Sequence, residues 1–306
     1  LGVIGCIYES RPNITTDIAS LCLKSGNAIV LRGGKEAINS NYALTELVRS
    51  AIAEVGITQD AVQFVSSSDR ALVKQMLKLD EYLDLIIPRG SAELIRFVGQ
   101  EATMPAITGG IGVCHVYVDK RVNITKALDI ILNAKTQRPT VCNALDTALI
   151  HSEIAPKLIP DMVSMLTSAG VEIRCASRSL ALVGPALRNV THAEESDWGQ
   201  EFLSLIMSVR IVDSMDEAIE HIERFGSGHS EAVLTEDKAI ASQFLDDVEA
   251  SVVLVNASTR FNDGGQLGLG AEVAISTNKI HARGPMGLRE LTSYKWTVLG
   301  TGQVRP

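Results

Sequence analysis

The first third of the chain alternates short apolar runs with amphipathic stretches, a pattern typical of repeated strand–helix units. A proline near its start and a glycine after its end bound the first amphipathic stretch, as expected of a helix. Repeated strand–helix units predict an α/β fold with a doubly wound parallel sheet that binds ligands at the carboxyl ends of its strands. The expected strands are residues 3–8, 27–31, 61–65 and 83–87, and the expected helices are 12–24, 35–54, one from 69, and 91–100.

The rest of the chain continues this α/β pattern. The expected strands are residues 113–118, 144–150, 171–174, 205–212, 232–234 and 251–255, and the expected helices are 124–136, 153–168, 215–224 and 238–248. Segment 256–287 is rich in glycine and has little periodicity, and such a long loop is usually functional. We expect a cofactor-binding domain at 1–116, a catalytic α/β domain at 117–290 and a tail at 291–306. The tail holds an apolar strand at 294–299 without a local partner, so we expect it to pair with another chain for oligomerisation.

Composition narrows the class of protein. Hydrophobic residues make up 46% of the 306 residues and aromatic residues only 4%, which favours packed α/β layers. The net charge of −8 argues against a general nucleic-acid binder, and no apolar run reaches the roughly 18 residues of a membrane span. The five cysteines are widely spaced, and no Cys/His cluster has zinc-ligand spacing, so we expect free thiols in the cytoplasm. No secretory signal is visible, and the chain starts at Leu1 on the edge of a strand, so we expect an N-terminally incomplete domain.

Three turns at the expected carboxyl edge of the first sheet suit a phosphate. Free backbone N–H groups at a helix start favour an anion, and cations beside glycines do the same. One such turn is weak evidence, because an ordinary strand–helix turn looks the same and the chain has no G-x-G-x-x-G. Three turns on one edge are more persuasive. Their residues are Tyr8–Asn13 with Arg11, then Arg32-Gly33-Gly34-Lys35, and finally Arg89-Gly90-Ser91.

Cys142 is the candidate nucleophile. It stands in a polar loop with Lys135 and Arg138, between an expected helix and an expected strand, and a thiolate presented to a cleft can attack a carbonyl. A buried, inert thiol is the more common state of a cysteine, and for the other four, in apolar elements, packing is the better interpretation. No histidine forms a triad with Cys142 at a recognisable spacing. His229 and His281 lie in Gly-rich polar settings that fit either substrate contact or hydrogen bonding within a loop.

A set of motifs spread over the whole chain matches a known family. The matching segments are residues 2–13, 24–28, 31–37, 84–91, 142–147, 226–229, 256–261, 268–272, 280–285 and 294–296. With these motifs the chain resembles the aldehyde dehydrogenase superfamily, and most closely the branch that reduces the acyl phosphate of glutamate. The resemblance implies that fold, with about a quarter of the usual enzyme missing at the N-terminus.

The resemblance also implies an activity and roles for residues. The activity is NADPH-dependent reduction of L-glutamyl 5-phosphate to L-glutamate 5-semialdehyde in proline biosynthesis, through a thioester on Cys142. The oxyanion donors would be the Cys142 backbone N–H and Asn13. Cations at Arg32 and Lys35, where NAD-preferring relatives have an acid, favour NADPH. The residues assigned to the cofactor are Arg32, Gly33, Lys35, Gly90, Ser91 and Glu201, and those assigned to the substrate are Arg11, Lys135, Arg138, His229, Ser258, Thr259 and Arg260.

One departure from the superfamily favours reduction. Hydrolytic members carry a glutamate before a Gly-Gly pair, where it is the general base for thioester hydrolysis. The corresponding residues 106–113 contain Gly109-Gly110 but no acid. A reductase that starts from an acyl phosphate needs no hydrolytic water, so the missing acid argues against aldehyde oxidation.

Other interpretations stay open at this point. A CoA-acylating aldehyde dehydrogenase would share Cys142 and the cofactor turns. A catalytically inactive truncated fragment would bind nucleotide without turnover. The chain is also compatible with being part of a bifunctional protein carrying a glutamate kinase, or with receiving its substrate from a separate glutamate 5-kinase. We expect a homo-oligomer in any of the enzymatic cases.

Overall fold

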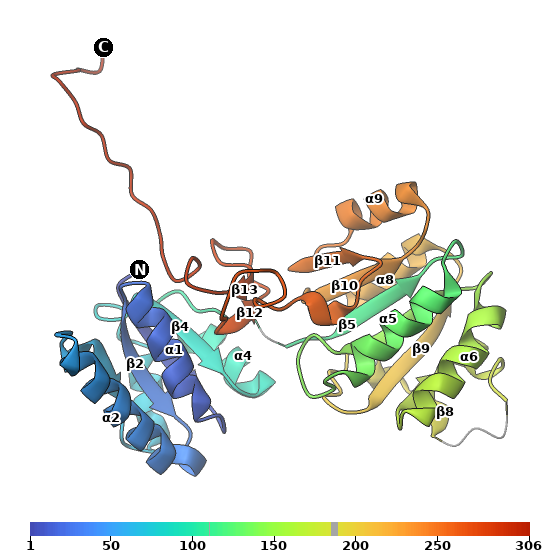
Figure 1. Ribbon diagram of the computed structural model, residues 1–306, viewed down its shortest axis with the longest axis horizontal. Coiled ribbons are helices and arrows are strands. Elements are labelled where there is room, and N and C mark those ends of the chain that lie inside the picture. Colours follow the sequence, from blue (N-terminus) through green and yellow to red (C-terminus); the bar gives the residue numbers. More distant parts are fainter. Residues whose placement is uncertain (110, 185–188) are drawn as a thin grey trace. The chain divides into compact units, whose positions relative to one another are not determined.

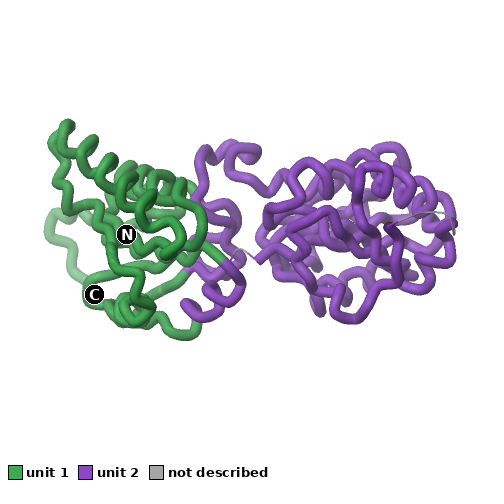
Figure 2. The backbone as a smooth tube through the Cα atoms, turned by 90° about the horizontal axis from the view of Figure 1, so that it is seen from below, with its two compact units in different colours: residues 1–90, 100–106, 287–306 green, residues 91–99, 107–286 purple. Residues whose placement is uncertain are grey.

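The computed structural model describes residues 1–109, 111–184 and 189–306. They form two compact units, one of residues 1–90, 100–106 and 287–306 and one of residues 91–99 and 107–286 (Figure 2). Each unit has its own parallel sheet, which confirms the predicted α/β class. Among the described helices, none is long and apolar enough to cross a membrane.

The first unit contains a four-stranded parallel sheet in the order β3-β2-β1-β4. Its strands are mostly buried, as expected for parallel strands covered by helices. Helices α1 and α2 pack against each other beside this sheet (Figure 1). The expected strands and helices up to residue 101 are present, with ends that differ by at most three residues. They are β1 Val3–Tyr8, α1 Asn13–Lys24, β2 Ala28–Gly33, η1 Lys35–Ala37, α2 Ile38–Glu54, η2 Gln59–Ala61, β3 Val62–Phe64, α3 Arg70–Met76, β4 Leu85–Arg89 and α4 Ala92–Glu101, of which residues 92–99 belong to the second unit.

The second unit contains a seven-stranded parallel sheet in the order β11-β10-β5-β6-β9-β7-β8. Helices α5 and α6 pack together, as do α8 and α9 (Figure 1). The elements are β5 Cys114–Val118, α5 Ile124–Thr136, β6 Leu145–His151, α6 Ala155–Ser168, β7 Glu172–Cys175, α7 Ser177–Leu180, β8 Val190–His192, η3 Glu195–Asp197, β9 Ile206–Val212, α8 Met215–Phe225, β10 Ser230–Leu234, α9 Lys238–Asp247, β11 Val252–Val255, η4 Thr259–Phe261, β12 Ala274–Ser276 and β13 Gly284–Met286.

Two apolar cores cover the two faces of the seven-stranded sheet. Val116 and Val118 of β5 belong to a core with residues of α5 and α6, whereas Tyr117 between them belongs to a core with residues of α8 and α9. Successive side chains of a strand point to opposite faces, so this alternation places one helix pair on each face. The continuous apolar runs in the sequence reflect this burial on both faces.

The structure adds short elements that the pattern did not predict. The segment 256–287 was expected to be a long loop, but it contains η4 and an antiparallel pair, β12 with β13. Helix α7 and strand β8 were also missed. These elements have only three or four residues, too few for a periodic pattern to show. Residues 294–299, expected to be a strand, have no assigned strand, and the Trp296 side chain is 88% exposed. Their pairing with another chain stays a prediction.

The boundary between the units lies earlier than the expected division at residue 116. Strand β5 pairs with β6 and β10, so it belongs entirely to the seven-stranded sheet. The tail 287–306 is grouped with the first unit, where the side-chain amide of Asn27 donates to the Leu291 carbonyl at 2.8 Å. Assignment of separate functions to these units stays a prediction.

Helix α9 allows a test of the second core. Phe244 is fully buried and its ring stacks on Tyr117 with centroids 6.3 Å apart, while the neighbouring Leu245 is 47% exposed. We expect Phe244→Ala to lower the free energy of unfolding by about 3–5 kcal/mol, because the cavity it leaves cannot fully collapse. Leu245→Ala is expected to change it by less than about 0.5 kcal/mol. Urea unfolding followed by circular dichroism measures both, and equal losses would contradict the core assignment.

Candidate active site

The three phosphate-compatible turns follow neighbouring strands of the sheet in the first unit. Tyr8 at the end of β1 is paired with Gly33 at the end of β2 and with Arg89 at the end of β4. The turns that follow these strands therefore leave the same carboxyl edge of the sheet, as the sequence predicted. Backbone N–H groups, glycines and cations from three segments meet at this edge, which is the usual ligand-binding edge of an open parallel sheet.

The second turn differs in detail from its predicted form. Arg32 is buried, and its Nη2 donates to the Ser68 carbonyl at 3.1 Å, while burial lowers the pKa of its guanidinium. Glu36 accepts hydrogen bonds from the backbone N–H and the hydroxyl of Ser10, at 2.6 and 3.1 Å. A hydrogen bond from its own backbone N–H and these bonds from Ser10 lower the pKa of its carboxyl. Lys35 is exposed. The accessible cation of this turn is therefore Lys35, while the buried Arg32 stabilises the loop through its hydrogen bond to Ser68.

The third turn begins helix α4. Gly90 and Ser91 are exposed, and the Ser91 hydroxyl accepts the Leu94 backbone N–H at 3.3 Å, which is an N-cap bond. In the first turn, Arg11 and Asn13 are exposed, and the Asn13 side-chain amide donates to Asp17 at 2.8 Å. Each of these predicted residues is thus available at the surface of its own unit.

Cys142 lies in the loop between α5 and β6, at the amino edge of the seven-stranded sheet. It is half-buried, whereas the other four cysteines are fully buried, and all five are free thiols. Burial raises the pKa of Cys22 and of Cys175 to about 12, and it raises the pKa of Cys6 and of Cys114 well above the usual value for a thiol. These four thiols are inert, which leaves Cys142 as the accessible sulfur.

The peptide of Cys142 packs against the start of β5. A Cβ at Gly112 would overlap the Cys142 carbonyl, so only glycine allows this approach. The buried Cys114 thiol donates to the same carbonyl at 3.1 Å. Glu201 accepts the Gly112 backbone N–H at 2.9 Å. The structure therefore brings Glu201, predicted from the sequence, next to the segment that supports Cys142.

A β-bulge lies at the start of β6, immediately after the Cys142 loop in the sequence. Cys114 is paired with Leu145, but His115 is paired with Thr147, so Asp146 is an extra residue in β6. The Asp146 carboxylate accepts the backbone N–H of Cys114 at 3.3 Å and that of Phe202 at 3.2 Å. The bulge thus turns one carboxylate toward two neighbouring segments.

Lys135 is the buried counter-ion of Asp146. Its Nζ lies 3.7 Å from the Asp146 carboxylate, which is an ion pair too long for a direct hydrogen bond, and 5.9 Å from the centre of the Phe202 ring. Burial raises the pKa of Asp146 to about 6 and lowers that of Lys135, and each charge partly offsets the shift of the other. Lys135 was predicted to bind the departing phosphate, but its side chain is fully buried, so it has a supporting position instead.

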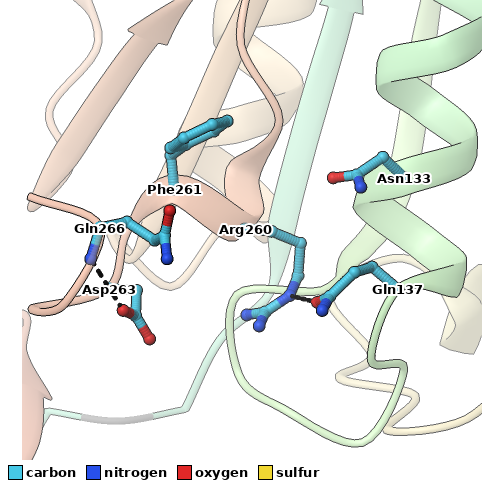
Figure 3. Close-up of a pocket in the computed structure, with 6 residues that line it drawn as sticks. All are labelled: Asn133, Gln137, Arg260, Phe261, Asp263 and Gln266. Atoms are coloured by element: carbon cyan, nitrogen blue, oxygen red, sulfur yellow. Dashed lines mark hydrogen bonds between the residues drawn. The ribbon is translucent and has the colours of Figure 1, made fainter.

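Arg260 lines a cavity beside the nucleophile loop. The cavity has a volume of about 250 Å³ and is lined by Asn133, Gln137, Arg260, Phe261, Asp263 and Gln266. Figure 3 shows Arg260 reaching from η4 toward Gln137 near the end of α5, with Nε donating to the Gln137 amide oxygen at 2.9 Å. Its Nη1 donates to the side-chain oxygen of Asn143, the residue after Cys142. Arg260 is therefore tied directly to the nucleophile loop.

Three other predicted substrate residues are buried. His229 is fully buried, its Nδ1 lies 2.7 Å from the Ser230 hydroxyl, and burial lowers its pKa to about 4, so its ring is neutral. Thr259 is fully buried and donates to the Asn143 carbonyl at 2.7 Å, and Ser258 caps η4 through Arg260 N–H at 3.3 Å. All three side chains are thus buried and make hydrogen bonds within their loops.

The remaining two predicted features are the cation Arg138 and the Gly109-Gly110 pair. Arg138 is exposed in the Cys142 loop and stays a candidate for phosphate contact. The Gly109-Gly110 pair corresponds to the segment that carries the general base in hydrolytic relatives. Its second residue, Gly110, lies outside the described residues. The preceding residue Thr108 is described, and its hydroxyl accepts from the Asn278 amide at 3.0 Å.

Sequence reasoning missed Gly112, Asn143 and Asp146. The Asn143 side chain donates to the Asn262 carbonyl at 2.8 Å and accepts from Arg260, so it joins the Cys142 loop to the segment around η4. Asn143 and Asp146 belong to the Cys142-Asn-Ala-Leu-Asp run, so their proximity to Cys142 was a usable signal. Nothing in the sequence marked Gly112 as the contact point, because 30 positions separate it from Cys142.

Known proteins resemble this chain in sequence over its whole length. The sequence model of the aldehyde dehydrogenase family matches residues 1–176. The gamma-glutamyl phosphate reductase of Roseiflexus castenholzii is 56% identical over 308 residues, which cover 100% of this chain and 73% of that protein. The protein of the same name from Shewanella woodyi is 52% identical over 305 residues, covering 100% of this chain and 72% of that protein.

Solved structures show the same relationship. The crystal structure of gamma-glutamyl phosphate reductase from Thermotoga maritima has a TM-score of 0.96 and 49% identity, and it covers 100% of this chain and 73% of that chain. An acetylating aldehyde dehydrogenase from Geobacillus thermoglucosidasius has a TM-score of 0.74 at 20% identity, covering 100% of this chain and 76% of that chain. The second likeness shows the fold alone.

The contact between Gly112 and Cys142 allows a direct test. We expect Gly112→Ala to displace the Cys142 loop and to lower the rate of Cys142 alkylation by iodoacetamide about tenfold or more, because the added methyl overlaps the Cys142 carbonyl. Gly184→Ala is the matched control, since a Cβ there meets open space. Mass spectrometry of the alkylated peptide measures the rate. An unchanged rate in Gly112→Ala would show that the contact does not position the sulfur.

Proposed function

This chain belongs to the aldehyde dehydrogenase family, within its group of gamma-glutamyl phosphate reductases, and on that premise we propose how its residues carry out the reaction. The reaction is the reduction of L-glutamyl 5-phosphate to L-glutamate 5-semialdehyde with release of phosphate, a step of proline biosynthesis. The observation that carries the proposal is a single half-buried thiol, Cys142, in a loop braced on one side by Gly112 and on the other by Asn143 and Arg260.

Cys142 acts as the nucleophile. Its thiolate attacks the acyl carbon, a C–S bond forms, the bond from that carbon to the phosphate oxygen breaks, and phosphate leaves. The nicotinamide cofactor, when bound, supplies the hydride that reduces the resulting thioester. The oxyanion of the thiohemiacetal on Cys142 then re-forms the carbonyl, which breaks the C–S bond and releases the free semialdehyde, and the departing Cys142 thiolate takes up a proton to return the thiol.

The developing oxyanion needs fixed donors. We assign the backbone N–H of Cys142 as one of them, in a loop whose Cys142 carbonyl is held by its contacts with Gly112 and Cys114. The side-chain amide of Asn13 is the second donor that we assign; it belongs to the other unit, so its role stays a prediction. The absence of an acid in residues 106–113 leaves no general base there for thioester hydrolysis, which favours reduction.

The substrate is an α-amino acid, and the Arg260 cavity has the matching groups. Arg260 and the amide of Asn133 suit an α-carboxylate, and Asp263 suits an α-ammonium. The exposed Arg138 and Arg11 are the cations that we assign to the phosphate group. Four further residues are buried, and we propose that they support these loops instead of contacting the substrate: Ser258, Thr259, His229 and Lys135.

The cofactor is a nicotinamide dinucleotide, and we propose NADPH. The turns after β1, β2 and β4 fit its phosphates, since Gly90 and Ser91 are exposed at a helix start and Arg32 supports the turn that carries the exposed Lys35. Lys35 would attract the 2′-phosphate, and Glu36 is held against Ser10 instead of projecting as a free acid. Glu201 is the carboxylate that we assign to the nicotinamide ribose.

The proposal also covers the compartment, the oligomeric state and the source of the substrate. Free cysteines suit a reducing compartment, and we propose the cytoplasm. The homo-oligomer and a glutamate 5-kinase as the source of substrate stay predictions.

The nucleophile is tested by the reverse reaction. Phosphate-dependent reduction of NADP⁺ by the semialdehyde, supplied as its cyclic form pyrroline-5-carboxylate, is expected to fall more than about 1,000-fold in Cys142→Ala, because no thioester forms. Cys175→Ala, at a buried thiol in β7, is expected to retain the activity. Circular dichroism checks that both variants fold.

Each other outcome of this assay has a meaning. Activity retained in Cys142→Ala would exclude the covalent mechanism. Dependence on CoA instead of phosphate would favour a CoA-acylating enzyme. NADPH binding without turnover by the folded wild-type chain would favour an inactive fragment.

Cofactor choice is tested at Lys35. We expect Lys35→Ala to raise the KM for NADPH about tenfold and to leave the KM for NADH nearly unchanged, because it removes one charge-assisted contact to the 2′-phosphate. Lys24→Ala is the control, because Lys24 is the last residue of α1 and the first phosphate-compatible turn lies at the start of that helix. Steady-state kinetics with both cofactors decides, and a parallel rise in both KM values would contradict the assignment.

A further inference from the structure

Cys114 is a buried thiol that the proposed reaction does not use, yet it touches the nucleophile's own backbone. Its side chain is 0% exposed, and its sulfur lies 3.1 Å from the carbonyl oxygen of Cys142. Burial raises the pKa of this thiol well above its usual value, so it keeps its proton and can donate. The sulfur also lies 3.9 Å from Nδ1 of the neutral His229.

Cys114 is in turn held by the bulge in β6. Its backbone N–H donates to the Asp146 carboxylate at 3.3 Å, in place of a regular ladder bond. Asp146 also accepts from the Phe202 backbone N–H at 3.2 Å and pairs with the buried Lys135 of α5, the helix that leads into the Cys142 loop. The Asp146 carboxylate therefore links the start of β5 and the segment before β9 to α5, the helix that precedes the Cys142 loop.

We propose that Cys114 is a positioning residue for Cys142: its thiol fixes the Cys142 carbonyl, and Asp146 holds Cys114 in the place from which it donates. Fixing the carbonyl fixes the plane of the peptide between Cys142 and Asn143 and so limits rotation about the Cα–C bond of Cys142, which helps to set the direction of the Cys142 side chain. The inference rests on the proposed role of Cys142 as nucleophile. It explains why a weak thiol donor is buried beside the one accessible sulfur.

Two isosteric pairs of variants separate the hydrogen bond from packing. Cys114→Ser keeps a donor and Cys114→Ala removes it at nearly equal volume; Cys114→Thr and Cys114→Val form a second pair of larger volume. The second pair replaces the first if Cys114→Ala does not fold. Cys175→Ala is the control for the loss of a buried thiol elsewhere in the same sheet. Circular dichroism and urea midpoints check that each variant folds.

Two readouts are measured on the whole chain. The first is the pH profile of Cys142 alkylation by iodoacetamide, which needs no substrate or cofactor. The second is kcat and KM in the phosphate-dependent reverse reaction. We expect the donor-free variant of each pair to lower the alkylation rate and kcat about fivefold or more with little change in KM, and the hydroxyl variant to stay within about twofold of wild type.

The inference fails if the donor-free and hydroxyl variants of a pair behave alike, because packing alone would then account for Cys114. It also fails if Cys175→Ala lowers the alkylation rate as much as Cys114→Ala does. The alkylation profile decides the role of Cys114 even if the wild-type chain shows no reductase turnover, so failure of the proposed function is seen separately from failure of this inference.

Discussion

The close approach of two backbones, at Gly112 and Cys142, is the constraint on which the candidate site depends. Side chains on both segments would keep the strand start and the nucleophile loop apart, and glycine removes that barrier. Once the two segments touch, the Cys114 thiol reaches the Cys142 carbonyl, and Glu201 reaches the Gly112 N–H. The bulge at Asp146 supplies the remaining support by turning a carboxylate toward both neighbouring segments.

Buried charge in this region supports the loop more than it contributes to global stability. An ion pair such as Lys135 with Asp146 loses much of its attraction to desolvation, and the opposed shifts of the two pKa values reflect that cost. Its benefit is specificity of position: α5, β6 and the segment before β9 are joined at one point. The same holds for Arg260, whose partly buried guanidinium is shared between Gln137 and Asn143 and so links the cavity to the nucleophile loop.

The two units place their chemistry at opposite ends of their strands. In the first unit the phosphate-compatible turns follow β1, β2 and β4, at the carboxyl edge where open α/β sheets usually bind ligands. In the second unit the nucleophile loop precedes β6, and Gly112, Cys114 and Glu201 precede or begin β5 and β9 at the amino edge, while Arg260 reaches the loop from η4 after β11. A helix–loop–strand order around Cys142 already indicated this, because a loop that leads into a strand lies at the strand's amino end.

The sequence by itself determined the α/β class, nearly all longer elements, the three phosphate-compatible turns and the choice of Cys142. These depend on local periodicity, on turn residues and on motifs that lie within a few positions of one another. Elements of three or four residues, such as β8, β12 and β13, were missed because they are too short to show a period. Only the tertiary structure decided which polar residues face solvent: Lys135, His229 and Thr259 occur in polar stretches of sequence, yet packing buries them, while Arg260 lines a cavity. Periodicity indicates which face of an element is apolar, but not which distant segment covers it, so contacts such as Gly112 with Cys142 appear only when the strands pair.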